Sequence, residues 1–132
     1  DLTGGLVAGR LLDASPENFV EGIIGNEEIP IRRLLALSTD QLLSDAEALT
    51  GELARAIRQH AGADLGLALH GILEPGETAE NLARGRTMIS ITDGTAFRSR
   101  TYESAGRGMP DRTRMSINAL ELVRMALTDG FE

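Results

Sequence analysis

The sequence contains no lysine, because all 13 of its basic residues are arginine. This absence excludes a lysine general base, a lysine Schiff base and the lysine of a phosphate-binding P-loop. Tryptophan is also absent, and aromatic residues make up only 3% of the chain. The sequence has no cysteine either. It therefore cannot form disulfides or thiolate zinc sites, and it cannot use a cysteine nucleophile.

No apolar run approaches the ~20 residues of a membrane span, and no segment resembles a signal peptide. Acidic residues outnumber basic ones by 20 to 13, for a net charge of -7. This balance weighs against nucleic acid or an anionic membrane as the main partner. The chain has 132 residues, of which 42% are apolar and 25% charged. These values predict one globular domain with one core, and we expect a cytoplasmic, bacterial protein.

The N-terminal third predicts two helices with a strand between them. Apolar residues at helical spacing from Leu6 to Leu12 predict a first helix. The segment Ser15-Pro16-Glu17-Asn18 should end it. The apolar run from Phe19 to Ile24 then predicts a short buried strand. Pro30 suits the first turn of a short second helix that reaches Leu35.

The middle of the chain predicts a longer helix followed by a buried strand. Ser44-Asp45-Ala46-Glu47 has the spacing of a capping box, with serine three residues before glutamate. The helix that it opens should run to about His60, and Gly62 is a natural stop. The segment Leu65-Gly66-Leu67-Ala68-Leu69 is almost wholly apolar, as the central strand of a covered sheet would be.

The C-terminal part predicts a loop, a hairpin and a helix. We expect a long loop from His70 to Arg86, and loops of this length are often functional. Strands over 87–92 and 96–102 should be joined at Asp93-Gly94, a strong hairpin signal. A terminal helix should begin at Pro110. Strands mixed with helices in this order predict a single α/β layer domain with a mixed sheet.

Few residues suggest chemistry by themselves. His60 falls in the last turn of a helix, where a cation complements the helix dipole. His70 ends a predicted buried strand, where α/β proteins place their ligands, although no partner for a catalytic base is evident. Thr3-Gly4-Gly5 at a helix start could hold a phosphate or carboxylate through backbone N–H groups, or could simply form a tight entry into the helix.

Charged residues divide into surface groups and candidate anion contacts. Arg98 and Arg100 fall on the predicted solvated face of the hairpin. Arg112 and Arg114 fall in the first turn of the last helix, the unfavourable end for a cation, which favours an anion or an acidic neighbour as partner. No histidine or aspartate has ligand spacing to the remaining acidic groups, so we expect a solvated surface and no metal there; these groups are Glu27, Glu28, Glu74, Glu77 and Glu80.

Taken together, the segments resemble one known family, the CinA C-terminal domain. The resemblance spans residue 1 to about 127 with few gaps, and its most specific part lies between Gly62 and Gly76. It is carried by Thr3-Gly4-Gly5-Leu6 with Ala8, Phe19 through Ile24, Arg33-Leu34-Leu35, Gly62-Ala63-Asp64-Leu65-Gly66-Leu67-Ala68, Gly71-Ile72 and Pro75-Gly76. The family includes C-terminal domains of competence/damage-inducible proteins and stand-alone nicotinamide-mononucleotide amidases. It implies a three-layer α/β/α fold.

The resemblance implies hydrolysis of the carboxamide of nicotinamide mononucleotide. In the family, a Ser-x-Thr-Gly-Gly motif presents a nucleophile at a helix N-terminus, and a Tyr-x-Asn-x-x-Lys motif supplies activating groups. Here Asp1 stands at the serine and Asn26 at the tyrosine. Ile31 stands at the lysine, or Ile29 if Asn26 is matched to the motif's asparagine. No realignment restores the lysine, because the chain has none.

Further departures surround the expected site. His70 replaces the threonine of the family's Thr-Gly-Ile, and the glycine-rich loop after it is altered to Leu73-Glu74-Pro75-Gly76-Glu77-Thr78. Asp111 and Arg112 remain of a Gly-Asp-Arg signature. The comparison also implies that the family's first helix and first strand, which precede Thr-Gly-Gly, are missing from residues 1–132.

The sequence therefore predicts a CinA-like domain that has lost amidase chemistry and keeps a ligand cleft or an assembly role. Its partner would be a pyridine nucleotide or another small anion, without a cofactor or a metal, and self-association into a homo-oligomer remains open. The alternative is an amidase with rebuilt chemistry, in which His70 acts with Asp1. The candidate ligand-binding residues are Thr3, Gly4, Gly5, Asn26, His70, Gly71 and Arg112.

Overall fold

The computed structural model describes residues 6–23, 33, 45–74, 84–104 and 109–131. Their elements follow the order α1 (Leu6–Ala14), α3 (Ala46–Ala61), β1 (Gly66–Glu74), β2 (Arg84–Thr92), β3 (Phe97–Ser104) and α4 (Met109–Asp129). The three strands form one sheet in the order β1-β2-β3. No helix among the described residues is long and apolar enough to cross a membrane.

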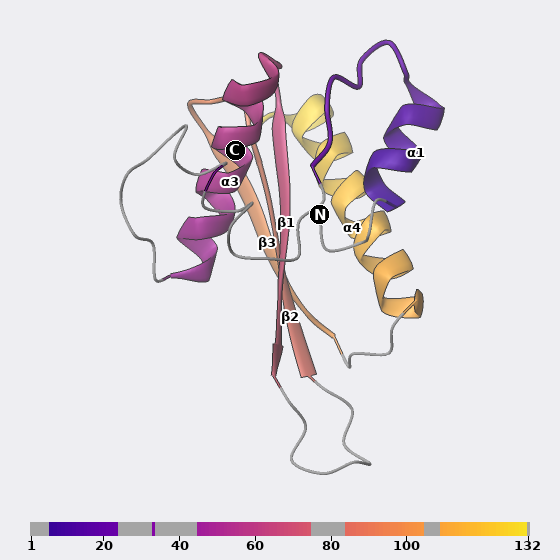
Figure 1. Cartoon of the computed structure of the whole chain (residues 1–132), viewed down its shortest axis with the longest axis vertical. Helices are drawn as coiled ribbons and strands as arrows, with labels where there is room; N and C mark the ends of the chain where they lie inside the picture. The colour runs from indigo at the N-terminus through magenta and orange to yellow at the C-terminus, as the bar shows by residue number, and fades with distance from the viewer. Residues whose placement is uncertain (1–5, 24–32, 34–44, 75–83, 105–108, 132) are drawn as a thin grey trace.

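The sheet lies between two helical layers (Figure 1). Helix α3 packs on one face, against β1 and β2, and α4 packs on the other, with α1 against α4. The predicted three-layer α/β/α domain is therefore confirmed. Both described strand pairs are antiparallel, with Leu69 opposite Ile89 and Ile89 opposite Arg100. The parallel pairing of the expected mixed sheet is not seen among the described residues.

The two faces of the sheet are packed differently. On the α4 face, large aliphatic side chains of β1 and β2 meet α4, and Ile89 and Leu122 are almost fully buried. On the α3 face the residues are small: Ala54 of α3 packs on Ala68, and a Cβ at Gly66 would overlap the Ala54 carbonyl oxygen. Small residues let α3 approach the strands closely, while the α4 face supplies most of the apolar core.

Residues at the two ends of α3 predict its position in the sequence correctly. The helix begins after Asp45, whose carboxylate accepts hydrogen bonds from the backbone N–H groups of Glu47 and Ala48. The cap is therefore Asp45 and not the expected Ser44, because aspartate offers the same acceptor one residue later. The helix ends at Gly62, which has the left-handed φ of 63° and donates its N–H to the Gln59 carbonyl. This is the glycine stop that the sequence predicts.

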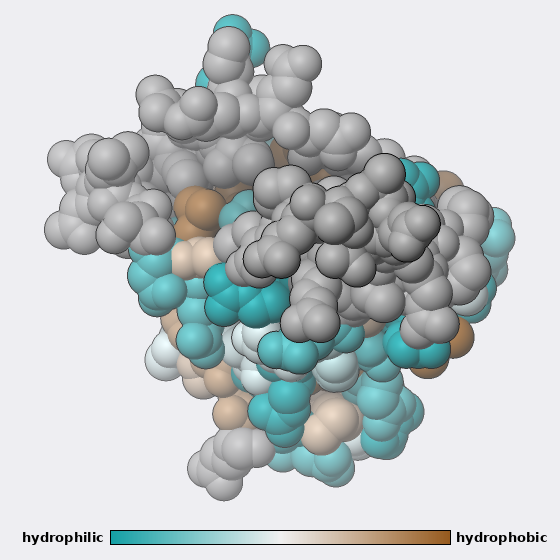
Figure 2. Space-filling model, turned by 90° about the horizontal axis from the view of Figure 1, so that it is seen from below, coloured by the Kyte–Doolittle hydropathy of each residue, from teal (hydrophilic) through white to brown (hydrophobic). Residues whose placement is uncertain are grey.

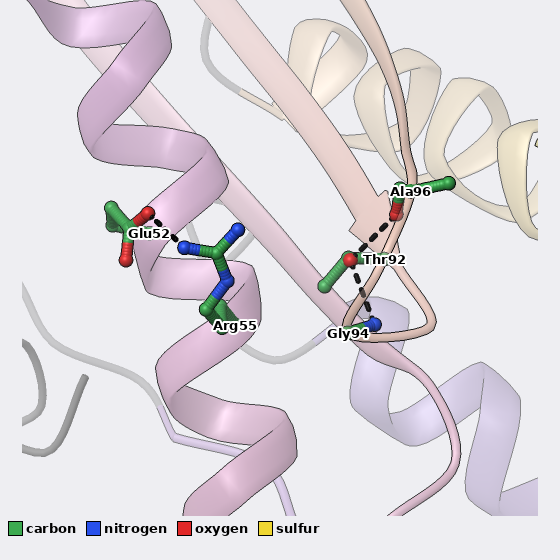
Figure 3. A network of polar contacts seen from close by, with 5 residues as sticks. All are labelled: Glu52, Arg55, Thr92, Gly94 and Ala96. Carbon is green, nitrogen blue, oxygen red and sulfur yellow. Dashed lines mark hydrogen bonds and ion pairs between the residues drawn. The ribbon is translucent and has the colours of Figure 1, made fainter.

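The predicted hairpin is confirmed, and its turn is held by two side chains. Gly94 has a φ of 98°, which favours glycine. The carboxylate of Asp93 accepts hydrogen bonds from the N–H groups of Thr95 and Ala96 at 2.8 and 2.9 Å. The hydroxyl of Thr92 accepts from the Gly94 N–H and donates to the Ala96 carbonyl (Figure 3). Every contact lies within a few residues, so this turn is specified locally.

One strand prediction and one loop prediction are wrong. Residues 19–23 form neither strand nor helix. Val20 is 61% exposed, and the ring of Phe19 folds back beside Gly22. The expected loop from His70 to Arg86 is also replaced in part, since β1 continues to Glu74 and β2 starts at Arg84. Pairing with β2 extends β1, a non-local contact that overrides its glycines.

One arginine prediction is wrong as well. Arg100 is exposed, as expected, but Arg98 is only 7% exposed. Arg98 lies directly opposite Ile91 in the register, so both side chains point to the same face of the sheet. Ile91 belongs to the apolar cluster on the α4 side. Arg98 is therefore buried by the third layer, which the alternation of residues along one strand does not reveal.

Candidate functional site

His70 is the described candidate residue with the most distinctive environment. It is half-buried on β1, directly opposite Met88. It lies two residues after Ala68, which packs against α3, so the imidazole faces the same layer. Burial lowers its pKa below the ordinary 6.5. His70 is consequently a neutral imidazole near pH 7, able to donate one hydrogen bond and accept another.

The geometry of His70 does not match that of a general base. Its Nδ1 atom is buried and has no hydrogen-bond partner in the part of the chain that the structure describes. A catalytic histidine is normally oriented by a carboxylate or carbonyl on one nitrogen while the other takes the proton. No such partner joins His70 among the described residues. The imidazole is therefore not set up for proton transfer by its described neighbours.

The other candidate residues fall into two groups. Gly71 lies next to His70 on β1, opposite Thr87, so these two candidates are adjacent. Arg112 is exposed near the start of α4, and no hydrogen bond or ion pair joins it to His70 in the described part of the chain. The remaining positions lie outside the described residues: Asp1, Thr3, Gly4, Gly5, Asn26 and Ile31.

A groove of about 920 Å³ runs along β1. Every residue from Ala61 to His70 lines it, and residues 17–23 line the opposite side. Figure 1 shows the chain after α1 turning back toward this strand. We call this feature the β1 groove, bounded by residues 61–70 and 17–23. Its volume lies at the upper end of the range of small-molecule sites, about 300–1,000 Å³.

The rim of the β1 groove is acidic. Its charged side chains in the described residues are Glu17, Glu21 and Asp64. One carboxylate oxygen of Glu21 lies 3.0 Å from Nε2 of His60, in the last turn of α3. This contact ties residues 17–23 to α3 and gives His60 a specific partner beyond the helix dipole. The groove was not predicted from the sequence, although the uncharged run over residues 65–69 is typical of a strand that is covered on both faces.

A second polar cluster lies at the middle of α3 (Figure 3). The guanidinium of Arg55 donates to the Glu52 carboxylate at 2.6 Å and lies 4.9 Å from the centre of the Phe97 ring. Both contacts bind the guanidinium of Arg55 to neighbouring side chains of the same domain. The hollow beside it is lined by Glu52 and Phe97 themselves. We therefore assign this cluster to packing between α3 and β3.

Elsewhere the surface gives little indication of a site. On the face drawn in Figure 2, hydrophilic residues predominate among those described, with hydrophobic residues in small patches. In residues 6–23, 45–74, 84–104 and 109–131, no group of three or more histidine, aspartate or glutamate side chains is arranged to hold a metal ion. The β1 groove with His70 is thus the best-formed candidate site in the described structure.

Comparison with known proteins gives a consistent result. The family model of the CinA C-terminal domain matches residues 1–127. The CinA-like protein of Geobacter sulfurreducens is 30% identical over 131 residues, which cover 95% of this chain and 32% of that protein. The CinA-like protein of Chlorobium limicola is 32% identical over 130 residues, covering 89% and 30%.

A third relative, the CinA-like protein of Desulfovibrio desulfuricans, is 30% identical over 131 residues, covering 92% of this chain and 31% of that protein. The chain therefore spans about a third of the length of the curated relatives it matches. The family match covers nearly all of this chain, including α1, α3 and β1, which border the β1 groove. The chain belongs to the CinA C-terminal domain family.

Proposed function

We propose that this domain binds a small ligand without hydrolysing it, as a CinA-like domain that has lost the family's amidase chemistry. The observation that carries the proposal is the complete absence of lysine. The resemblance implies a lysine that activates a serine hydroxyl. Here Ile31 stands at the lysine position and Asp1 at the serine position. Without an activated nucleophile, hydrolysis of an unactivated amide has no evident route.

The properties of His70 support a binding role. His70 lines the β1 groove as a neutral imidazole because burial lowers its pKa, and its buried Nδ1 has no hydrogen-bond partner among the described residues. A ligand that satisfied this atom would remove the cost of a buried unpaired polar group. Arg112, at the position of the family's signature arginine, would be the counterion for a phosphate. A pyridine nucleotide carries both an aromatic amide and a phosphate.

Two measurements on the chain with nicotinamide mononucleotide test the proposal. We expect no ammonia release above the buffer rate, together with a rise in melting temperature. A ligand at 100 times its dissociation constant adds about 2.7 kcal/mol to the free energy of unfolding, which corresponds to several degrees for a domain of this size. The rise should shrink in Arg112→Ala and persist in the matched control Arg124→Ala, whose arginine pairs with Glu121 on the surface.

Two outcomes would overturn the proposal. Sustained ammonia release that disappears in Asp1→Ala or His70→Ala would establish rebuilt amidase chemistry in place of binding alone. No thermal shift with nicotinamide mononucleotide, nicotinic acid mononucleotide or inorganic phosphate would remove the small-ligand role and leave assembly as the function of the domain.

A further inference from the structure

The contact between Glu21 and His60 joins two parts of the molecule that lie on opposite faces of the sheet. Helix α3, which carries His60 in its last turn, packs on β1 and β2. Helix α1, from which the chain continues into residues 17–23, packs on α4 in the other layer (Figure 1). One carboxylate oxygen of Glu21 nevertheless lies 3.0 Å from Nε2 of His60. The pair therefore bridges the two helical layers.

The same pair bridges the two walls of the β1 groove. His60 directly precedes Ala61, where the wall formed by residues 61–70 begins, and Glu21 lies in the opposite wall. His70 lies at the far end of the first wall. As long as the pair is intact, it limits how far the two walls can separate at the Ala61 end of the groove.

Glu21 is positioned by contacts within its own segment. The side-chain amide of Asn18 donates to the hydroxyl of Ser15 at 2.8 Å, which closes the turn after α1. A Cβ at Gly22 would lie 3.0 Å from the ring of Phe19, so the chain folds tightly on itself around Glu21. A carboxylate that is already held in place loses less conformational entropy when it pairs with a second side chain.

The strength of the contact depends on the charge of His60. Histidine is the side chain that ordinarily changes charge between pH 5 and pH 8. A hydrogen bond from a protonated imidazole to a carboxylate is charge-assisted, and such bonds are roughly twice as strong as those between neutral groups. The side chains of His60 and Glu21 are 44% and 40% exposed, so the gain is that of an exposed pair. Protonation should therefore tighten the contact, and loss of the proton as the pH rises should loosen it.

The other charged groups of the neighbouring segments make different contacts. Glu17, in the same wall as Glu21, accepts a hydrogen bond within its own turn at 3.1 Å. Arg58 of α3 donates to the carbonyl of Asp64, in the turn that follows the helix, at 2.9 Å. The second histidine of the chain, His70, takes up a proton only at lower pH, because burial lowers its pKa. Of the charged residues that the structure describes, Glu21 is thus the one paired with the His60 imidazole.

We propose that the Glu21–His60 pair is a proton-sensitive clasp on the β1 groove, which holds residues 17–23 against α3 more firmly when His60 is protonated and thereby slows the release of a bound ligand. As the pH rises, neutral His60 holds this wall less firmly and the groove opens more readily. The clasp itself is a property of the chain alone, whereas its effect on ligand release rests on the proposed function.

Amide hydrogen exchange of the chain without ligand, at pH 6.0 and pH 8.0, tests the clasp. Protection factors are compared, because they remove the ordinary pH dependence of exchange. We expect residues 17–23 to be protected roughly two- to fivefold more at pH 6.0 than at pH 8.0, the range of an exposed ion pair. Glu21→Gln keeps the size of the side chain and removes its charge, so this variant should lose the difference between the two pH values.

Two further variants separate the clasp from a merely structural contact. Glu17→Gln is the matched control, because it neutralises a carboxylate of the same wall that does not contact His60; it should keep the pH difference. His60→Arg carries a permanent charge and should give the protection of the pH 6.0 state at both pH values. The clasp is overturned if the unaltered chain shows equal protection at both pH values, or if Glu21→Gln retains the difference.

The rate at which nicotinamide mononucleotide dissociates tests the effect on ligand release. We expect slower release at pH 6.0 than at pH 8.0 by the same two- to fivefold, beyond any pH dependence that Glu21→Gln also shows and that belongs to the ligand. Equal ratios in the two proteins would overturn the control of release. If no nucleotide binds at either pH, the proposed function fails, and with it the effect on release, while the exchange experiment still decides the clasp.

Discussion

The two edge strands of the described sheet are built on opposite principles. Strand β3 carries Arg100, Thr101 and Glu103, all exposed, and charged side chains of this kind discourage pairing with other chains. Strand β1 has an uncharged run over residues 65–69 and borders a groove of about 920 Å³. Strand β1 therefore has the composition of a covered strand, and β3 has the composition of a strand that faces solvent.

The strand between the two edges sets the scale for testing this contrast. Ile89 of β2 is fully buried in the main apolar cluster. We expect Ile89→Ala to lower the free energy of unfolding by about 2–5 kcal/mol, because a cavity replaces the lost side chain. Thr101→Ala on the exposed edge of β3 should change it by no more than about 0.5 kcal/mol. Urea denaturation followed by circular dichroism measures both, and equal effects would refute the assigned core.

A glycine tests how firmly β1 is held on α3. A Cβ at Gly66 would overlap the carbonyl oxygen of Ala54, so Gly66→Ala should destabilise the domain by about 1–3 kcal/mol. The matched control is Gly9→Ala, at an exposed position of α1 where an added Cβ meets nothing within 4 Å. That change should stabilise by up to about 1 kcal/mol. A neutral Gly66→Ala variant would mean that α3 and β1 are not in close contact.

The β3 side of the sheet depends on a local turn. Hydrogen bonds from the backbone N–H groups of Ala96 and Thr95 lower the pKa of the Asp93 carboxyl. A lowered pKa means that the unfolded chain binds protons first, so this stabilisation is present above about pH 3.8 and is lost as the pH falls. We expect Asp93→Ala to lower the melting temperature at pH 7.

Asparagine at the same position keeps an oxygen acceptor for the two N–H groups. Asp93→Asn should therefore lose less stability than Asp93→Ala and should also lose the acid dependence of this carboxyl. Differential scanning calorimetry at pH 7 and pH 3 compares the variants. If alanine and asparagine were equivalent, the hydrogen bonds of Asp93 would not stabilise the hairpin.

On the β1 side, the corresponding titrating group is His70. Burial lowers its pKa below 6.5, so below that pH the unfolded chain binds a proton that the folded chain resists. The free energy of unfolding is therefore not reduced by this group above pH 6.5. It should fall as the pH decreases from 6.5 to the lowered pKa of the folded state. His70→Gln should flatten this part of the pH profile, whereas His60→Gln should keep it. Urea denaturation from pH 7.5 to pH 5 shows whether the slope belongs to His70.

Local features of this molecule could be predicted from the sequence, and non-local ones could not. The Gly62 stop of α3 and the Asp93-Gly94 turn depend on contacts within a few residues. The burial of Arg98 and the length of β1 depend on layers and strands distant in sequence. Of the candidate site, His70 was identified, but the groove beside it was not, since it is formed by segments from three helices and the chain before Ile23.

Amide hydrogen exchange resolved along the sheet tests the contrast between the edges most directly. The amides of β1 over residues 66–69, which lie between α3 and the α1/α4 layer, should exchange more slowly than those of β3 over residues 100–103, where Arg100, Thr101 and Glu103 are exposed. Contradiction would come from β1 amides that exchange as fast as those of β3.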